Sequence, residues 1–113
     1  MSLNFLFKVI FICFLIINFS CFGQTTYYIN SINGNDTFDG LSSLSPWQTI
    51  DKINTITLYP GDSVKFYSGQ TFLGMFQPIG NGNINNPIII DSYGGNGRVI
   101  INGENHLACI YLD

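Results

Sequence analysis

Short apolar runs separated by turn residues fill the second half of the sequence, and they constrain the fold more than any other feature. The runs read SVKFY, TFLGMF, PIIIDSY, RVIIN and LACIYL, and the separators include SGQ, GNGNINN, GGNG and GEN. Each run is too short, and too weakly periodic at helical spacing, to form a helix. Runs of this kind, bounded by Gly, Asn and Ser, are typical of β-strands. The chain after Leu58 is therefore predicted to be all β.

The spacing of the runs indicates how these strands stack. Pairs of apolar residues two positions apart recur at steps of 24 and then 22 residues, and side chains two apart share one face of a strand. Parallel stacking then gives a solenoid, in which each coil buries its face against its neighbours. An antiparallel sandwich is the alternative, but its runs recur every 8 to 12 residues. The predicted apolar columns are Val64, Ile88 and Ile110, and Phe66, Ile90 and Leu112.

The first residues predict a secretory signal peptide. Lys8 precedes an unbroken apolar run, residues 9–17, which small residues follow up to Gly23. This order of basic, apolar and small residues is typical of a cleaved signal, here residues 1–23. A membrane anchor needs roughly 20 apolar residues, and Asn18 interrupts the run, although an uncleaved anchor and a lipoprotein acylated on Cys21 remain alternatives. We expect a secreted or cell-surface protein, extracellular or periplasmic, without a stable membrane span after cleavage.

Composition limits the partners. Lys52, Lys65 and Arg98 are the basic residues after the signal, against seven acidic residues, and the formal net charge of the chain is −3. No basic stripe is present, so nucleic acid is excluded as an expected partner. Cys109 is the one cysteine that remains after the predicted cleavage, so no disulfide framework is expected.

Residues 24–58 have a different sequence pattern from the short apolar runs of the second half. TYYIN, residues 26–30, predicts an aromatic and β-branched strand. The later stretch SPWQTIDKINTI predicts one short helix, with Ser45 as its cap and Pro46 in its first turn. Three apolar residues fall at helical spacing on one face of that helix. They are Trp47, Ile50 and Ile53.

These stretches resemble the N-terminal end of secreted bacterial right-handed parallel β-helix proteins, the pectate-lyase-like superfamily. The resemblance covers nearly all of Thr26 to Gly103, and its most specific pieces are GND followed by DG, PWQTI, and PGD before a strand. It implies that residues 24–58 form a strand, a loop and a capping helix, and that residues 59–113 form the first two or so coils. A cap is also physically required, because the first coil would otherwise expose its interior and unpaired backbone groups.

Many members of that superfamily are polysaccharide lyases or glycoside hydrolases, and others are adhesins. The resemblance therefore implies the N-terminal part of a secreted carbohydrate-active protein, with a polysaccharide or cell-surface glycan as partner. The alternative is a non-catalytic surface or adhesion protein that binds carbohydrate. We assign no catalytic residue and no complete active site. Because a stable solenoid usually needs at least three repeats and caps at both ends, we expect the chain to be a fragment of a longer one.

The stretch NGNDTFDG, residues 33–40, has the composition of a calcium loop. Aligning Gly40 with the obligatory glycine of an EF-hand loop places Pro46 where a bidentate Glu belongs, so that template fails at its strongest ligand. Asn and Asp also accept backbone hydrogen bonds in turns, where Gly supplies positive φ. We therefore favour a turn here over a metal site.

A second candidate metal site follows from the predicted columns. If Ile90 and Leu112 face inward, Asp91 and Asp113 face outward about 4.8 Å apart, in one column with Tyr67. Two stacked carboxylates repel unless a cation intervenes, so this column is the candidate calcium site. His106 has no partner at metal-ligand spacing and is interpreted as a solvated loop histidine.

Overall fold

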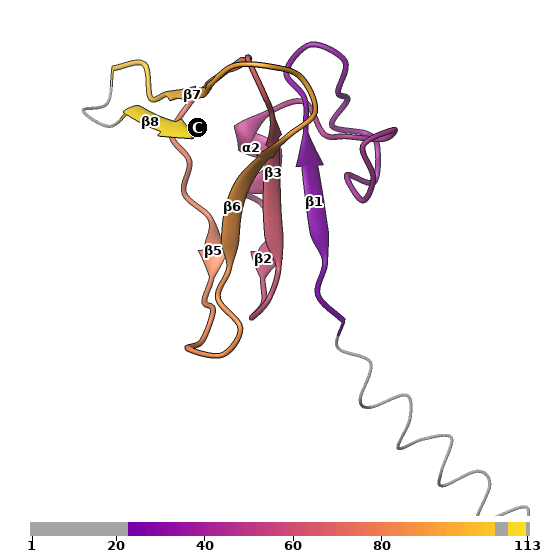
Figure 1. Ribbon diagram of the computed structural model, residues 1–113, viewed down its shortest axis with the longest axis vertical. Helices are drawn as coiled ribbons and strands as arrows, with labels where there is room; N and C mark the ends of the chain where they lie inside the picture. The colour runs from indigo at the N-terminus through magenta and orange to yellow at the C-terminus, as the bar shows by residue number, and fades with distance from the viewer. Residues whose placement is uncertain (1–22, 106–108, 113) are drawn as a thin grey trace, which may run out of the picture.

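A computed structural model describes residues 23–105 and 109–112 (Figure 1). The predicted signal peptide lies, apart from Gly23, outside the described residues and stays a prediction. The described part is mostly strand with very little helix, as the sequence predicts. Its elements are β1 (Thr26–Ile29), α2 (Ile50–Ile53), β2 (Thr57–Leu58), β3 (Ser63–Tyr67), β4 (Thr71–Leu73), β5 (Ile79–Gly80), β6 (Ile89–Tyr93), β7 (Val99–Asn102) and β8 (Cys109–Leu112).

The strands form three small sheets, which the chain visits in a fixed cyclic order. The sheets are β1-β3-β6, β2-β5 and β4-β7-β8. The chain passes through β2, β3 and β4, then returns to the same sheets in the same order through β5, β6 and β7 (Figure 1). Successive passes pair in parallel. Parallel pairing of strands from successive passes contradicts the antiparallel sandwich.

The register between β3 and β6 differs from the predicted columns. Val64 pairs with Ile90 and Phe66 with Ser92, so the step between the two passes is two residues longer than the predicted step of 24. The predicted pairing of Val64 with Ile88 is wrong because the apolar run begins with Pro87. Proline has no N–H to donate to a ladder, and the strand begins only at Ile89.

Strand β8 also differs from its predicted place. Ile110 pairs with Ile101 and Leu112 with Val99, in an antiparallel ladder on β7. The predicted parallel columns ending in Ile110 and Leu112 are therefore wrong. The connection between β7 and β8, residues 103–108, explains the difference: a parallel return needs a crossover of a dozen or more residues, whereas a short connection makes a hairpin.

One apolar core lies between the three sheets and the helix. Alternation along the strands turns every second side chain inward, so buried residues alternate with half-buried ones in β3 and with exposed ones in β4. Phe66 lies at the centre, with its ring 4.9 Å from that of Phe72 and 5.5 Å from that of Phe76. The buried apolar residues are Ile29, Trp47, Ile50, Ile53, Leu58, Val64, Phe66, Phe72, Val99 and Ile101.

The helix starts later than the sequence predicts. Thr49, with extended backbone angles, caps α2 by accepting a hydrogen bond from the amide of Lys52. Ser45 and Pro46 are not helical, and Trp47 instead forms a parallel bridge with Ile29 of β1. The prediction of Ser45 as the cap is wrong because pairing with β1 holds this segment extended.

Candidate functional site

Asp36, in the stretch Asn33–Gly40, positions the start of α2. Its Oδ1 accepts hydrogen bonds from the backbone amides of Gln48 and Thr49 at 2.8 and 3.0 Å, and its Oδ2 accepts one from the Thr49 hydroxyl at 2.6 Å. Partial burial acts to raise the pKa of Asp36, but these hydrogen bonds outweigh it and hold the pKa below its usual value. Asp36 is thus an ionised acceptor that ties the loop to the helix.

Asn35 and Asp39 act as turn acceptors in the same loop. Asn35 Oδ1 accepts from the amide and hydroxyl of Thr37 at 2.9 and 2.7 Å. Asp39 Oδ1 accepts from the Leu41 amide at 2.9 Å and the Ser45 hydroxyl at 2.7 Å, and the two bonds lower the pKa of Asp39. These hydrogen bonds are the ones that the turn interpretation predicts. Among the described residues, no group of three His, Cys, Asp or Glu is arranged to hold a metal ion.

The same loop covers the outer edge of β1. The amide of Tyr28 donates to the Gly40 carbonyl at 2.8 Å, the amide of Trp47 donates to the Tyr28 carbonyl at 2.9 Å, and the amide of Asn30 donates to the Trp47 carbonyl at 2.8 Å. An uncovered edge strand presents unpaired backbone groups to any other strand. Here the segment from Gly40 to Trp47 occupies that edge, so β1 offers no free ladder on this side.

Trp47 holds this covering segment on the core. Its ring stacks on Tyr27 with centroids 5.3 Å apart, and its Nε1 donates to the Phe38 carbonyl at 2.7 Å. Lys52 Nζ lies over the Trp47 ring, 5.3 Å from its centroid. Gly40 has φ +70°, and a Cβ there would lie 2.5 Å from the Trp47 ring, so only glycine fits.

A buried amide pair joins the loop to the turn before β4. Asn30 Oδ1 accepts from the amides of Ile32 and Asn33 at 3.1 and 2.9 Å and from Gln70 Nε2 at 2.9 Å. Gln70 Oε1 accepts from the amide and hydroxyl of Ser31 at 2.8 and 2.9 Å. Both amides are buried and hydrogen-bonded, as buried polar groups must be. Sequence patterns did not predict this pair, although Asn30 at the end of a strand is a signal for it.

A cavity of about 330 Å³ opens beside this network. Its lining residues are Ser31, Gln48–Ile50 and Thr71–Leu73, so it lies between the end of β1, the start of α2 and strand β4. The lining combines hydroxyl and amide side chains with the apolar Phe72 and Leu73, and it contains no charged side chain. The sequence did not identify this cavity, because its walls come from three segments that only the fold brings together.

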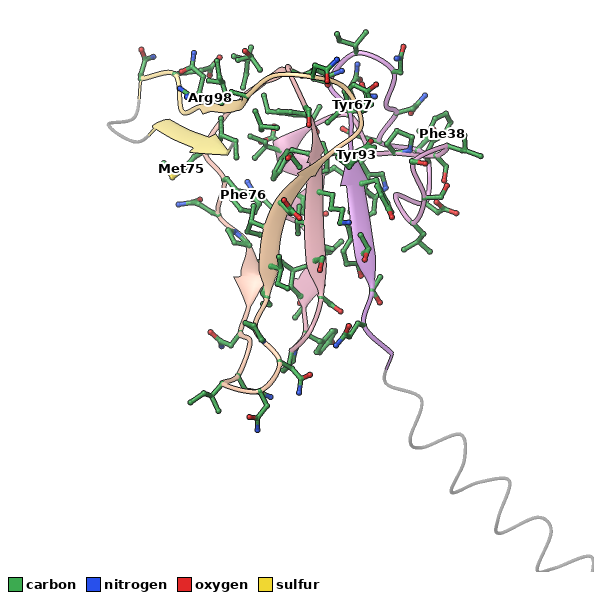
Figure 2. The ribbon with its side chains drawn as sticks, viewed as in Figure 1. Phe38, Tyr67, Met75, Phe76, Tyr93 and Arg98 are labelled. Carbon is green, nitrogen blue, oxygen red and sulfur yellow. The ribbon has the colours of Figure 1, made fainter. Side chains whose placement is uncertain are left out.

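The β1-β3-β6 sheet carries a cluster of tyrosines, two of which, Tyr67 and Tyr93, are labelled in Figure 2. The Tyr93 ring makes edge-to-face contacts with Tyr28 and Tyr67, with centroids 5.0 and 5.2 Å apart. Burial is the main cause that raises the pKa of Tyr93 to about 12, reinforced by the neighbouring Tyr67 and Tyr28. Within the described residues, the buried Tyr93 hydroxyl lacks a partner in hydrogen-bond geometry. The three rings pack on one another, and Tyr93 stays neutral at physiological pH.

Of the two residues of the candidate calcium column, the structure describes Asp91. It is exposed on β6 beside Lys65, its register partner on β3, and its Oδ1 accepts a hydrogen bond from the next backbone amide at 2.8 Å. Tyr67 pairs with Tyr93 and not with Asp91, so the predicted column Tyr67, Asp91, Asp113 is wrong in its register. Asp113 lies outside the described residues, and calcium binding by Asp91 and Asp113 stays a prediction.

His106 lies outside the described residues, so its interpretation as a loop histidine is untested. Cys109 begins β8. None of the helices within residues 23–105 and 109–112 is long and apolar enough to cross a membrane.

Comparison with known proteins identifies relatives of one kind. No protein-family model matches the chain. Over 74 residues, 62% of this chain, the sequence is 40% identical to a lacto-N-biosidase of Bifidobacterium longum subsp. longum, and the matched part is 5% of that enzyme's length. The chain thus spans about one-twentieth of the curated relative that it matches.

Comparison with solved structures also identifies a lacto-N-biosidase. The fold is similar to that of the native GH136 lacto-N-biosidase from Eubacterium ramulus, with a TM-score of 0.53 and 31% identity, over 65% of this chain and 12% of that one. The selenomethionine derivative of the same enzyme gives a TM-score of 0.53 and 27% identity, over 73% of this chain and 13% of that one. The named relatives of this chain are therefore glycoside hydrolases, and the resemblance to carbohydrate-active proteins is supported.

Proposed function

We propose that this chain is the N-terminal scaffold of a secreted glycoside hydrolase that acts on a glycan of the kind a lacto-N-biosidase cleaves. The observation that carries the proposal is the 40% identity over 74 residues to a lacto-N-biosidase. The structural similarity to a second lacto-N-biosidase, at 31% identity, supports it independently of that alignment. A non-catalytic adhesion protein, the alternative in the sequence, is not favoured, because both named relatives are enzymes.

The proposed architecture is a right-handed parallel β-helix whose N-terminal end is closed by the loop of residues 30–49 and by α2. The cyclic order of the three sheets and the parallel pairing of successive passes support a coil. The backbone hydrogen bonds that cover the outer edge of β1 support the assignment of the loop as part of the cap. Secretion rests on the apolar N-terminal run of the sequence.

In this proposal no carboxylate among the described residues is assigned a catalytic role. Glycoside hydrolases commonly use a pair of Asp or Glu residues on either side of the scissile bond. Asp36 and Asp39 serve as acceptors within the loop. Asp62 is buried and accepts the amides of Thr25 and Tyr59 at 2.9 and 2.8 Å. These three carboxylates therefore have structural roles, as acceptors of hydrogen bonds within the fold.

A segment exchange tests the proposal. The matched 74-residue segment of the Bifidobacterium enzyme is replaced by the corresponding segment of this chain, and release of lacto-N-biose from a chromogenic lacto-N-bioside is measured. We expect the chimera to fold and hydrolyse the substrate, and the 113-residue chain alone to release nothing. The unmodified enzyme is the positive control. A folded chimera that fails to hydrolyse, beside an active parent, would refute the scaffold assignment.

A further inference from the structure

The edge of β4 that lines the cavity has unpaired backbone groups. The amide of Ile100 donates to the Gln70 carbonyl at 3.0 Å, and the amide of Gly74 donates to the Asn102 carbonyl at 2.9 Å. These bonds fix the parallel ladder with β7, in which alternate residues of a strand bond to the same neighbour. The N–H and C=O groups of Thr71 and Leu73 must therefore point away from β7, toward the other side of β4.

No strand covers that side within the described part of the chain. β4 ends its sheet, in the order β4-β7-β8, and the backbone contacts of the described residues include none to Thr71 or Leu73 on this edge. Thr49 lies across the cavity in an extended conformation, but its hydroxyl bonds to Asp36 and not to β4. The edge of β1 is covered and the edge of β4 opens onto a cavity, so the cavity holds donors and acceptors that the described residues leave unpaired.

The lining defines the chemistry of a fitting ligand. Thr71 adds an exposed hydroxyl to the free backbone groups, and Gln48 adds an exposed amide whose Nε2 also donates to the Ser31 carbonyl at 3.3 Å, while Leu73, 60% exposed, adds an apolar surface. No charged side chain lines the cavity, and the nearby carboxylate of Asp36 is already hydrogen-bonded. A volume of about 330 Å³ is at the lower end of the range in which proteins hold small molecules. The ligand must be small, neutral and rich in hydroxyls, with one apolar face.

We propose that this cavity binds one neutral sugar ring of a glycan, as a subsite remote from the hydrolysed bond. Hydroxyls at the rim of the ring pair with the free groups of Thr71 and Leu73 and with Gln48, and the C–H face of the ring packs on the Leu73 side chain. A compact ring fits better than an added peptide strand, because β4 offers an edge of only three residues. The choice of a sugar among neutral polyols rests on the proposed function.

Amide chemical shifts of the isotope-labelled 113-residue chain test the subsite. Galactose, N-acetylglucosamine and lacto-N-biose are titrated separately to millimolar concentration, with glycerol as a polyol that has no ring. We expect saturable shifts at Ser31, Gln48, Thr49, Thr71 and Leu73 with at least one sugar and none with glycerol. Equal shifts with glycerol, shifts confined to other surfaces such as the tyrosine cluster, or no saturable shifts with any sugar would overturn the proposal.

Two matched substitutions localise the binding. Thr71→Val removes the hydroxyl in the cavity, and Thr57→Val makes the same change at an exposed threonine on β2 outside it. Loss of one hydrogen bond corresponds to about three- to tenfold weaker binding for Thr71→Val, and Thr57→Val is expected to bind as the unmodified chain does. If Thr71→Val does not fold, Gln48→Leu replaces it, with the same expected loss. Unchanged affinity in a folded cavity variant contradicts the subsite.

The segment exchange and the sugar titration can fail independently of each other. An active chimera together with an absence of sugar shifts refutes the subsite and leaves the hydrolase proposal standing. Sugar shifts at the cavity together with a folded, inactive chimera keep the subsite and refute the scaffold assignment.

Discussion

Two loops of this protein both contain turn-forming Asn and Gly but have very different structural roles. The connecting loop, residues 30–49, and the loop between β5 and β6, residues 81–88, are both rich in Asn and Gly. The connecting loop places Asn30 and Trp47 in the interior and holds the edge of β1 through three backbone hydrogen bonds. In the β5–β6 loop every residue from 81 to 87 is exposed. Buried side chains anchor the connecting loop, whereas residues 81–87 of the β5–β6 loop bury none.

The contacts inside the β5–β6 loop are local. Asn83 Oδ1 accepts from the amides of Asn85 and Asn86 at 3.1 and 2.7 Å, and the backbones of Asn83 and Asn86 bond to each other. Among the described residues, its backbone bond to another segment runs from the Gly61 amide, in the turn before β3, to the Asn86 carbonyl at 3.0 Å. Such a loop forms its own turn but contributes little to the core.

The largest difference between the loops is expected at Trp47. Trp47→Ala removes a ring that is 5% exposed and stacked on Tyr27, and it should lower the free energy of unfolding by about 3 to 5 kcal/mol. The matched change Ile84→Ala, at a side chain 96% exposed in the other loop, should change it by less than about 0.5 kcal/mol. Urea unfolding followed by circular dichroism measures both. Similar losses of unfolding free energy at the two sites would contradict the different structural roles of the two loops.

A smaller difference is expected between the polar anchors. Asp36→Ala leaves the amides of Gln48 and Thr49 and the Thr49 hydroxyl without their acceptor, at an expected cost of about 1 to 3 kcal/mol. Asn83→Ala removes acceptors only from exposed amides that water can satisfy, so about 0.5 kcal/mol or less is expected. The same unfolding assay compares them, and an equal cost would show that Asp36 does not anchor the loop.

Acid should weaken the connecting loop. The pKa values of Asp36 and Asp39 are below the ordinary value of 3.8, so the stability that these groups contribute is present above that value and is lost as the pH falls through their folded-state values. We expect the thermal unfolding midpoint to fall as the pH drops below about 4, and to fall less steeply in the Asp36→Asn variant. Thermal unfolding between neutral pH and pH 2 checks this. A thermal midpoint that rises on acidification would contradict a stabilising role of the ionised, hydrogen-bonded carboxylates.

The smallest effect is expected from lengthening the exposed loop. Two glycines inserted after Asn85 add only loop-closure entropy, so the free energy of unfolding should fall by about 0.6 kcal/mol or less. The same insertion after Ser42 separates Gly40 from Trp47 in the segment that covers β1, and it should cost more. If both insertions are tolerated equally, the covering segment is not held at its two ends.

Part of this protein follows from the sequence alone. Alternating apolar residues in SVKFY make a strand with Val64 and Phe66 inward, and Gly and Asn clusters end each run, because side-chain alternation and positive φ are local properties. The resemblance carried by GND, PWQTI and PGD agrees with relatives that are glycoside hydrolases. The turn role of Asp39 also follows from its own neighbourhood, since it bonds to Leu41 and Ser45.

The tertiary structure decided what depends on distant partners. The N–H of Trp47 meets the Tyr28 carbonyl, and that contact keeps Ser45 and Pro46 out of the helix that their local preferences favour. Register is set by where Pro87 ends the turn, so Asp91 lies beside Lys65 and not beside Tyr67. The cavity, too, exists only because β1, α2 and β4 meet. Hydrogen bonds and packing between segments far apart in the chain have no signal in any one segment, and they outweigh local preferences where the two conflict.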